Sequence, residues 1–178
     1  NVPVVGASGN EYLSRIAYPA RAPSVMSVGA TTLRGCIADY SNSGFGLDIV
    51  APGGGSDADL PGDKQCKPFG RSGPEIYQLA YTANFTQQPP GSFRYRLDRK
   101  SVQRFTYVRE EGTSMASPHV AGAAALVIAS GVLGDKPTPD AIRKQLERTA
   151  KDLGKGGLDK RYGAGLLDIG AATRPLPK

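Results

Sequence analysis

The segment at residues 112–122, Gly-Thr-Ser-Met-Ala-Ser-Pro-His-Val-Ala-Gly, constrains this chain more than any other. Ser114 follows two small residues that let the backbone turn sharply and leave the hydroxyl uncovered. Residues 115–130 are rich in Ala, Val, Ile and Leu and predict a buried helix, with Pro118 in its first turn. Such a helix points its positive end and unpaired N–H groups at the serine. The pattern indicates a presented nucleophile; the alternative is a small-residue helix start without chemistry.

Residues 2–7, 24–30 and 47–51 predict short strands, and the first and third of these are predicted to be buried apolar runs. Thr138-Pro139 then resembles a helix start, and Ile142, Leu146 and Ala150 form one apolar stripe after it. Strands mixed with helices predict an α/β fold with a mostly parallel sheet. Asn10 follows the first strand, at the end where such sheets place their sites. Taken alone, Asn10 would be read as an ordinary turn residue after Gly9, but the Ser114 motif favours a functional role.

These segments resemble the subtilisin-like serine proteases (subtilases, peptidase family S8). The Ser114 motif is similar to the nucleophile signature of that family, and Asn10 matches the amide that donates to the oxyanion. Weaker similarity continues through residues 18–30, 40–53 and 162–168. The resemblance covers about residues 2–54 and 110–173. It implies that residues 1–178 are the C-terminal portion of one subtilase catalytic domain, with an insertion at about 55–109.

The family resemblance implies a serine endopeptidase, a hydrolase that cleaves proteins through an acyl-enzyme. Ser114 would attack, and Asn10 with the Ser114 backbone N–H would bind the oxyanion. Substrate contacts are expected from the residues around these two groups, namely Gly6, Ala7, Ser8, Gly9, Ala17 and Thr113. The chemistry requires no cofactor.

A serine nucleophile needs a base and an orienting acid, and the sequence contains one histidine, His119. Five residues along a helix correspond to about 140° of rotation and about 7.5 Å of rise, so His119 should face away from Ser114. Subtilases order their triad Asp, His, Ser along the chain, so the resemblance implies that the catalytic Asp and His lie upstream of Asn1. We expect the fragment alone to be inactive. The alternative is an inactive subtilase-derived module that binds a partner through a basic hairpin.

That hairpin is predicted within the insertion. Residues 55–91 are rich in Pro, Gly and polar groups and predict an extended loop, whereas residues 92–108 alternate and predict a β-hairpin turning near Asp98–Lys100. Phe93, Tyr95 and Leu97 would share one face, and arginines would share the other. The aromatic face could pack on the domain or shape substrate access. Basic residues among aromatics can also bind single-stranded nucleic acid, but we do not expect a nucleic-acid partner here.

The resemblance also implies a structural calcium site, as in the proteinase K branch of the family. The carbonyls of Pro23 and Val25 and the carboxylate of Asp48 occupy the matching positions, and hard oxygen ligands suit Ca²⁺. The alternative is that Asp48 is a surface acid at a loop end.

Composition sets broader limits. The chain has 178 residues and a net charge of +6, which a basic soluble surface explains. No apolar stretch is long enough to cross a bilayer. Cys36 and Cys66 could form a disulfide or remain free thiols. By resemblance we expect an extracellular or cell-envelope location. Expected partners are a protein or peptide substrate, the upstream part of the domain and, as a further candidate, a propeptide.

Overall fold

The computed structural model describes residues 2–60, 66, 74–81, 85–87, 95–97 and 105–175. The chain forms two compact units. The first combines Asn1–Ile76 with Glu111–Lys178, and the second is Tyr77–Glu110. The second unit is shorter than the insertion expected from the sequence, because the residues from 55 to 76 group with the first unit.

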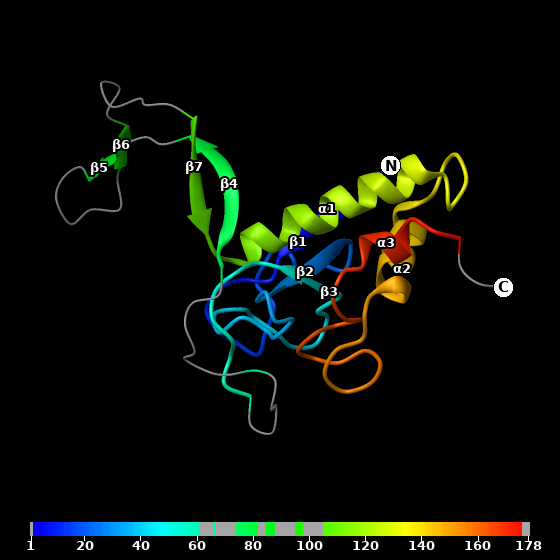
Figure 1. The fold of residues 1–178 in the computed structure, drawn as a ribbon, viewed down its shortest axis with the longest axis horizontal. Helices are drawn as coiled ribbons and strands as arrows, with labels where there is room; N and C mark the ends of the chain where they lie inside the picture. The colour runs from blue at the N-terminus through cyan, green and yellow to red at the C-terminus, as the bar shows by residue number, and fades with distance from the viewer. Residues whose placement is uncertain are drawn as a thin grey trace. The chain divides into compact units, whose positions relative to one another are not determined.

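The first unit is built on a parallel sheet with the strand order β1-β2-β3 (Figure 1). These strands are β1 (Val4–Ala7), β2 (Val25–Thr31) and β3 (Ile49–Pro52). The register pairs Val5 with Met26 and Ala30 with Ala51. Every residue of β2 after Val25 is buried, as expected for a parallel strand covered on both faces. The three predicted strands are therefore confirmed. The predicted burial of the first strand is wrong, because β1 is an edge of the described sheet and only its Gly6 is buried.

Within the part of the chain that the structure describes, three helices accompany the sheet, namely α1 (Thr113–Ser130), α2 (Pro139–Thr149) and α3 (Ile169–Ala172). Figure 1 shows α1 running beside the strands, with α2 and α3 together near its C-terminal end. The predicted start of α2 is confirmed, because the Thr138 side chain accepts a hydrogen bond from the Ala141 N–H at 3.2 Å. The family expectation of a parallel sheet flanked by helices is confirmed as well.

Helix α1 begins two residues earlier than the sequence pattern predicted. Ser114 therefore lies inside the first helical turn rather than just before it. Pro118 in turn lies beyond the first turn, where a proline removes the hydrogen bond to the carbonyl four residues back. That carbonyl belongs to Ser114, so the helix makes one bond fewer at the nucleophile.

The two faces of the sheet pack against different layers. Ile49 and Ala51 of β3 join the core cluster that contains α1 and α2, through residues such as Val120 and Leu146. Val50, which lies between them in β3, points to the opposite face and joins a second cluster made by loops. This second cluster includes Ile16, Ala20, Ile37, Leu47, Ala58, Leu60 and Tyr162. The helices thus cover one face of the sheet and loops cover the other.

The C-terminal segment returns to the free side of β3. The Val50 N–H donates to the Gly165 carbonyl at 3.0 Å, and the Leu167 N–H donates to the Val50 carbonyl at 2.9 Å. This places residues 162–167, which resemble the closing motif of the family, against the sheet. A disulfide joins Cys36 to Cys66, which settles the alternative between bridged and free cysteines.

The second unit contains two short ribbons. Strand β4 (Ile76–Tyr81) pairs with β7 (Phe105–Glu110), and β5 (Phe85–Gln87) pairs with β6 (Tyr95–Leu97). The prediction of an extended loop over residues 55–91 is therefore wrong for β4 and β5. The predicted hairpin between residues 92–98 and 102–108 is also not formed as expected, because each of its strands pairs with an earlier strand.

The error arose because periodicity identifies a strand but not its partner. The predicted turn at Asp98–Lys100, Phe93 and the side chains of Tyr95 and Leu97 lie outside the described residues. In the β4–β7 ribbon the Tyr77 and Tyr107 rings stack with centroids 5.0 Å apart, and both side chains are exposed rather than buried. Within the described parts of the chain, no helix combines the length and apolar character needed to cross a bilayer.

Candidate active site

Ser114 is exposed at the N-terminal end of α1. The residue before this helix, Gly112, is buried and has φ 152°, a conformation that disfavours other residues. The two residues after Ser114, Met115 and Ala116, both donate their backbone N–H groups to the Gly112 carbonyl. No residue that the structure describes engages the Ser114 N–H. That donor is thus available to an acceptor from outside the protein.

The Asn10 side chain is oriented by the residue that opens α1. Its Oδ1 atom accepts hydrogen bonds from the Thr113 backbone N at 2.9 Å and from Thr113 Oγ1 at 2.7 Å. Thr113 is fully buried, and its Oγ1 also accepts from the Gly9 N–H at 3.3 Å. Because both hydrogen bonds of the Asn10 amide oxygen go to Thr113, the Nδ2 group of the same amide points away from Thr113.

Gly112 lies between the two expected oxyanion donors. A β-carbon placed on Gly112 would lie 3.4 Å from Asn10 Nδ2 and 3.7 Å from the Ser114 backbone N. Both N–H donors therefore border the same small space, which is open because Gly112 has no side chain. Two N–H groups converging beside an exposed hydroxyl can stabilise an oxyanion formed by attack of that hydroxyl.

The loop before α1 is anchored on the carboxyl end of β3. The Gly112 N–H donates to the Gly53 carbonyl at 3.0 Å, and Tyr40 Oη lies 2.8 Å from the same oxygen. A β-carbon on Gly53 would lie 2.5 Å from the Ala30 β-carbon in β2, so the close approach requires glycine. The hydrogen bond between Gly112 and Gly53 thus fixes the position of the Ser114 turn relative to the carboxyl end of β3.

Acidic groups surround this anchor. Burial raises the pKa of Glu111, and the negative charges of Asp39 and Glu75 raise it further. Burial is also the main reason that the pKa of Asp39 is raised, and it raises the pKa of the Tyr40 phenol. Burial thus favours the protonated form of both carboxyl groups.

His119 lies on α1 and is bound to its own helix. Its Nδ1 atom is 2.8 Å from the Met115 carbonyl, one helical turn earlier. The half-buried ring is thus engaged in a local contact, as expected for a structural histidine.

The residues predicted to contact substrate differ in exposure. Gly6 and Ser8 are buried, and Ser8 Oγ donates to the Asn42 carbonyl at 2.9 Å. Ala7, Gly9 and Ala17 are half-buried. A cavity of about 530 Å³ is lined by Glu11, Leu13, Arg15, Ile16, Ala17, Tyr18, Arg21 and Asn42. It brings Ala17 together with the residue that follows Asn10.

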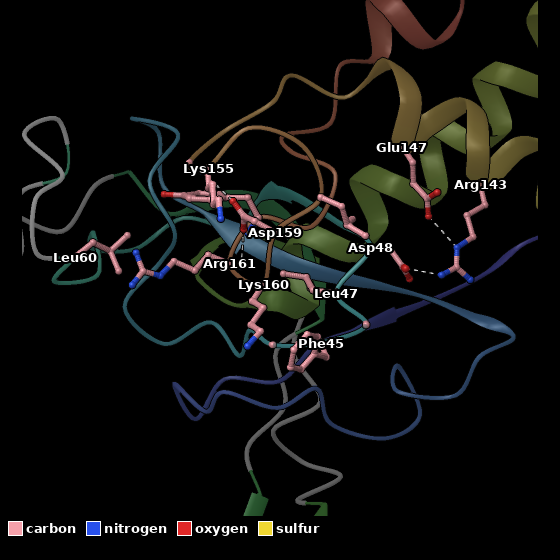
Figure 2. A pocket seen from close by; sticks show the side chains of 15 residues that line it. Phe45, Leu47, Asp48, Leu60, Arg143, Glu147, Lys155, Asp159, Lys160 and Arg161 are labelled. Carbon is pink, nitrogen blue, oxygen red and sulfur yellow. Dashed lines mark hydrogen bonds and ion pairs between the residues drawn. The ribbon is translucent and has the colours of Figure 1, made fainter.

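Two of the three groups expected to bind calcium, the Asp48 carboxylate and the Pro23 carbonyl, are engaged by an arginine that the sequence analysis did not single out. Arg143 of α2 forms an ion pair with Asp48 Oδ1, and its Nη1 donates to the Pro23 carbonyl at 3.2 Å. Its Nε donates to Glu147 at 2.9 Å, as Figure 2 shows. Burial alone would lower the pKa of Arg143, but Glu147 and Asp48 raise it overall.

This arrangement does not fit a calcium ion as it stands. Asp48 is buried, and its second oxygen accepts a hydrogen bond from the Ser27 backbone N at 2.6 Å. Both carboxylate oxygens are therefore already satisfied by the protein. Among the described residues, no three His, Cys, Asp or Glu side chains cluster as metal ligands. Asp48 and Arg143 are 95 positions apart, so no local sequence signal pointed to their pairing.

An exposed hydroxyl at a helix start beside two converging N–H donors is an arrangement typical of α/β serine hydrolases. Comparison with known proteins gives the family. The model of the subtilase family (Peptidase S8) matches residues 1–165. The chain belongs to the subtilase family.

Individual relatives agree with this assignment. The chain is 38% identical to Subtilisin BL of Lederbergia lenta over 96% of the chain and 46% of that protein. It is 37% identical to an alkaline protease of Alkalihalobacillus alcalophilus over 96% of the chain and 32% of that protein. The crystal structure of a lanthipeptide protease matches with a TM-score of 0.64 at 29% identity, covering 97% of this chain and 50% of that one. The chain thus spans half the length of these relatives or less.

Proposed function

We propose that this chain supplies the nucleophile and the oxyanion donors of a serine endopeptidase. The observation that carries the proposal is the relation between Ser114 and Asn10. The hydroxyl is exposed at a helix start, and Thr113 turns the Asn10 amide so that its N–H group faces the space beside it. Membership in the subtilase family supports the same chemistry.

In the proposed reaction, Ser114 Oγ attacks the scissile carbonyl and gives its proton to a base. The carbonyl oxygen becomes an oxyanion that accepts hydrogen bonds from Asn10 Nδ2 and from the Ser114 N–H. Collapse expels the amine, which takes the proton from the base, and leaves an acyl-enzyme on Ser114. In the second half of the reaction, water gives a proton to the base and attacks the acyl carbon of the ester. The Ser114 oxygen then leaves and takes that proton from the base, which releases the acid product and the free enzyme.

We propose that the base and its orienting aspartate come from residues outside these 178. His119, the one histidine of the sequence, is held by the Met115 carbonyl on its own helix. The rest of the domain is then the first partner of this chain. Strand β1 is an edge of the described sheet, and its Val4 is 58% exposed, which suits pairing with a further strand. This chain alone should lack peptidase activity.

We propose a location outside the cytoplasm, because the Cys36–Cys66 disulfide is stable in oxidising compartments. Calcium bound at Asp48 would have to displace the Arg143 guanidinium from both Asp48 and the Pro23 carbonyl. Calcium binding at this position therefore competes with an internal cation. The substrate would be a protein or peptide.

The test is covalent labelling of the natural protein that contains this chain by a fluorophosphonate, which reacts with activated serines. We expect labelling of the wild type, no labelling of Ser114→Ala, and cleavage of a peptide substrate that is lost in the same variant. Ser117→Ala is the matched control, because it removes a nearby helical hydroxyl that donates to the Thr113 carbonyl. A folded wild type that is neither labelled nor active would instead favour an inactive binding module.

A further inference from the structure

We propose that Asn42 is the positioning residue that holds the oxyanion loop, residues 8–13, in its active geometry. The inference rests on the proposed function, because it assigns a role toward Asn10. Asn42 comes from a different part of the chain, the segment between β2 and β3, and does not itself face the space beside Ser114. It acts through the backbone on both sides of Asn10.

The Asn42 side chain uses its full hydrogen-bonding capacity on this loop. It is 1% exposed. Its Oδ1 atom accepts from the Leu13 N–H at 2.8 Å and from the Glu11 N–H at 3.1 Å. Its Nδ2 group donates to the Ser8 carbonyl at 3.1 Å and to the Glu11 carboxylate at 2.7 Å. A carboxamide can make four such bonds, and here all four go to the loop that carries Asn10.

The backbone of Asn42 adds two more bonds to the same loop. Its N–H donates to the Gly9 carbonyl at 2.9 Å, and its carbonyl accepts from Ser8 Oγ at 2.9 Å. The residues immediately before and after Asn10 are therefore both fixed by one residue.

Gly9 shows how closely the two segments approach. A β-carbon on Gly9 would lie 2.2 Å from Asn42 Nδ2, a separation that no real side chain can adopt. Gly9 also has φ 110°, which favours glycine. The loop is thus shaped around the Asn42 amide, and the two residues depend on each other.

Asn42 is itself anchored to the centre of the sheet. Its neighbour Ser41 is buried, and Ser41 Oγ accepts a hydrogen bond from the Ala30 N–H of β2 at 3.0 Å. The Ser41 N–H donates to the Ala38 carbonyl at 3.0 Å. The oxyanion loop is therefore connected to β2 through the hydrogen bonds of Ser41 and Asn42.

Thr113 and Asn42 together position Asn10. Thr113 orients the side-chain amide, and Asn42 sets the backbone from which that side chain extends. Because a displacement of about 1 Å can cost on the order of 100-fold in rate, loss of either support should act on kcat. Substrate binding, which depends on other contacts, should change much less.

The test is a double-mutant cycle in the natural protein that contains this chain. Asn42→Ala should lower kcat by roughly 10- to 100-fold with little change in KM. In an Asn10→Ala background the same substitution should lower kcat by less than about twofold, because the group through which it acts is already gone. Equal losses in both backgrounds would show a general structural role and overturn the proposal.

Gln145→Ala is the matched control. Gln145 is also a carboxamide that is 1% exposed, and its Nε2 donates to the Ala172 carbonyl at 2.9 Å. Its loss should lower the unfolding temperature to a similar degree and leave kcat unchanged. A kcat loss in Gln145→Ala as large as that in Asn42→Ala would count against the specific role.

A second measurement does not depend on activity. Hydrogen exchange should show that the Glu11 and Leu13 amides lose protection in Asn42→Ala, while the amides of β2 keep theirs. Unchanged protection at both positions would overturn the proposal even if the wild type proved inactive. If Asn42→Ala does not fold, Asn42→Asp with Glu11→Gln replaces it. That pair restores the contact between residues 42 and 11 with donor and acceptor exchanged, and it should recover part of the kcat that Asn42→Asp alone loses.

Discussion

Asn10 and Thr113 form a two-point contact in which one amide oxygen accepts from both the backbone N, at 2.9 Å, and the hydroxyl, at 2.7 Å, of the same residue. The residues are 103 positions apart. This contact joins the end of β1 to the start of α1. The nucleophile and the oxyanion donor therefore share one rigid connection rather than two independent loops.

We expect Thr113→Val to lower kcat by roughly 2- to 13-fold, the equivalent of one neutral hydrogen bond of about 0.5–1.5 kcal/mol. Valine keeps the shape of the buried side chain but removes the hydroxyl that orients Asn10 and accepts from the Gly9 N–H. Steady-state kinetics on a peptide substrate measures the effect. Ser117→Val, which alters a neighbouring hydroxyl of α1, is the control. A change in KM without a change in kcat would contradict the orienting role.

Gly112→Ala should abolish most activity. The new methyl group would enter the space between Asn10 Nδ2 and the Ser114 N, where the oxyanion is expected, and φ 152° would add strain. In subtilisin, loss of one oxyanion donor costs about 10²–10³ in kcat, and we carry over that scale for blocking the same space. Fluorophosphonate labelling rates measure the loss. Gly122→Ala is a suitable control, because a β-carbon at Gly122 meets nothing within 4 Å.

Glu111→Gln should stabilise the protein at neutral pH more than at acidic pH. The Glu111 carboxylate lies against Gly55, although the residue is exposed overall. Burial, Asp39 and Glu75 raise its pKa above the ordinary 4.5. The folded state therefore binds this proton more tightly than the unfolded state, so the favourable contribution is present below pH 4.5 and is lost as the pH rises through the folded pKa.

Unfolding temperatures at pH 4 and pH 7 check this prediction. The difference between Glu111→Gln and wild type should be larger at pH 7. Glu110→Gln removes the same charge one position earlier and serves as the control. A gain of equal size at both pH values would mean that the ionisation of Glu111 does not disfavour folding.

The sequence was informative where function and local pattern coincide. The Ser114 motif located the helix start to within two residues, and apolar runs located all three strands of the parallel sheet. The Thr138-Pro139 pair located the start of α2, because capping is a local interaction. These features depend on neighbours within a few positions of each other.

The sequence was uninformative about contacts between distant segments. Alternation identified strands near residues 95 and 105, but their partners came from earlier residues that had been assigned to a loop. Asn42 appeared only as part of a family-like segment, and Arg143 only as a polar residue beside a helical stripe. Asn42 binds the backbone N–H of Leu13, 29 positions away, and Arg143 binds the backbone carbonyl of Pro23, 120 positions away. Only the fold brings these groups together.

Arg143→Met should make stability depend more strongly on calcium. The substitution keeps much of the apolar stem but leaves the buried Asp48 carboxylate without its cation, which should cost about 1.5–3 kcal/mol in the presence of EDTA. Calcium would then meet Asp48 and the Pro23 carbonyl without a competing guanidinium. Unfolding temperatures in EDTA and in millimolar calcium measure the effect, and we expect the calcium-induced increase to be larger in the variant than in the wild type. Arg148→Met, which removes a cation of the same helix bound to Gln145, is the control. An equal increase in variant and wild type would show that the arginine and calcium do not compete for Asp48.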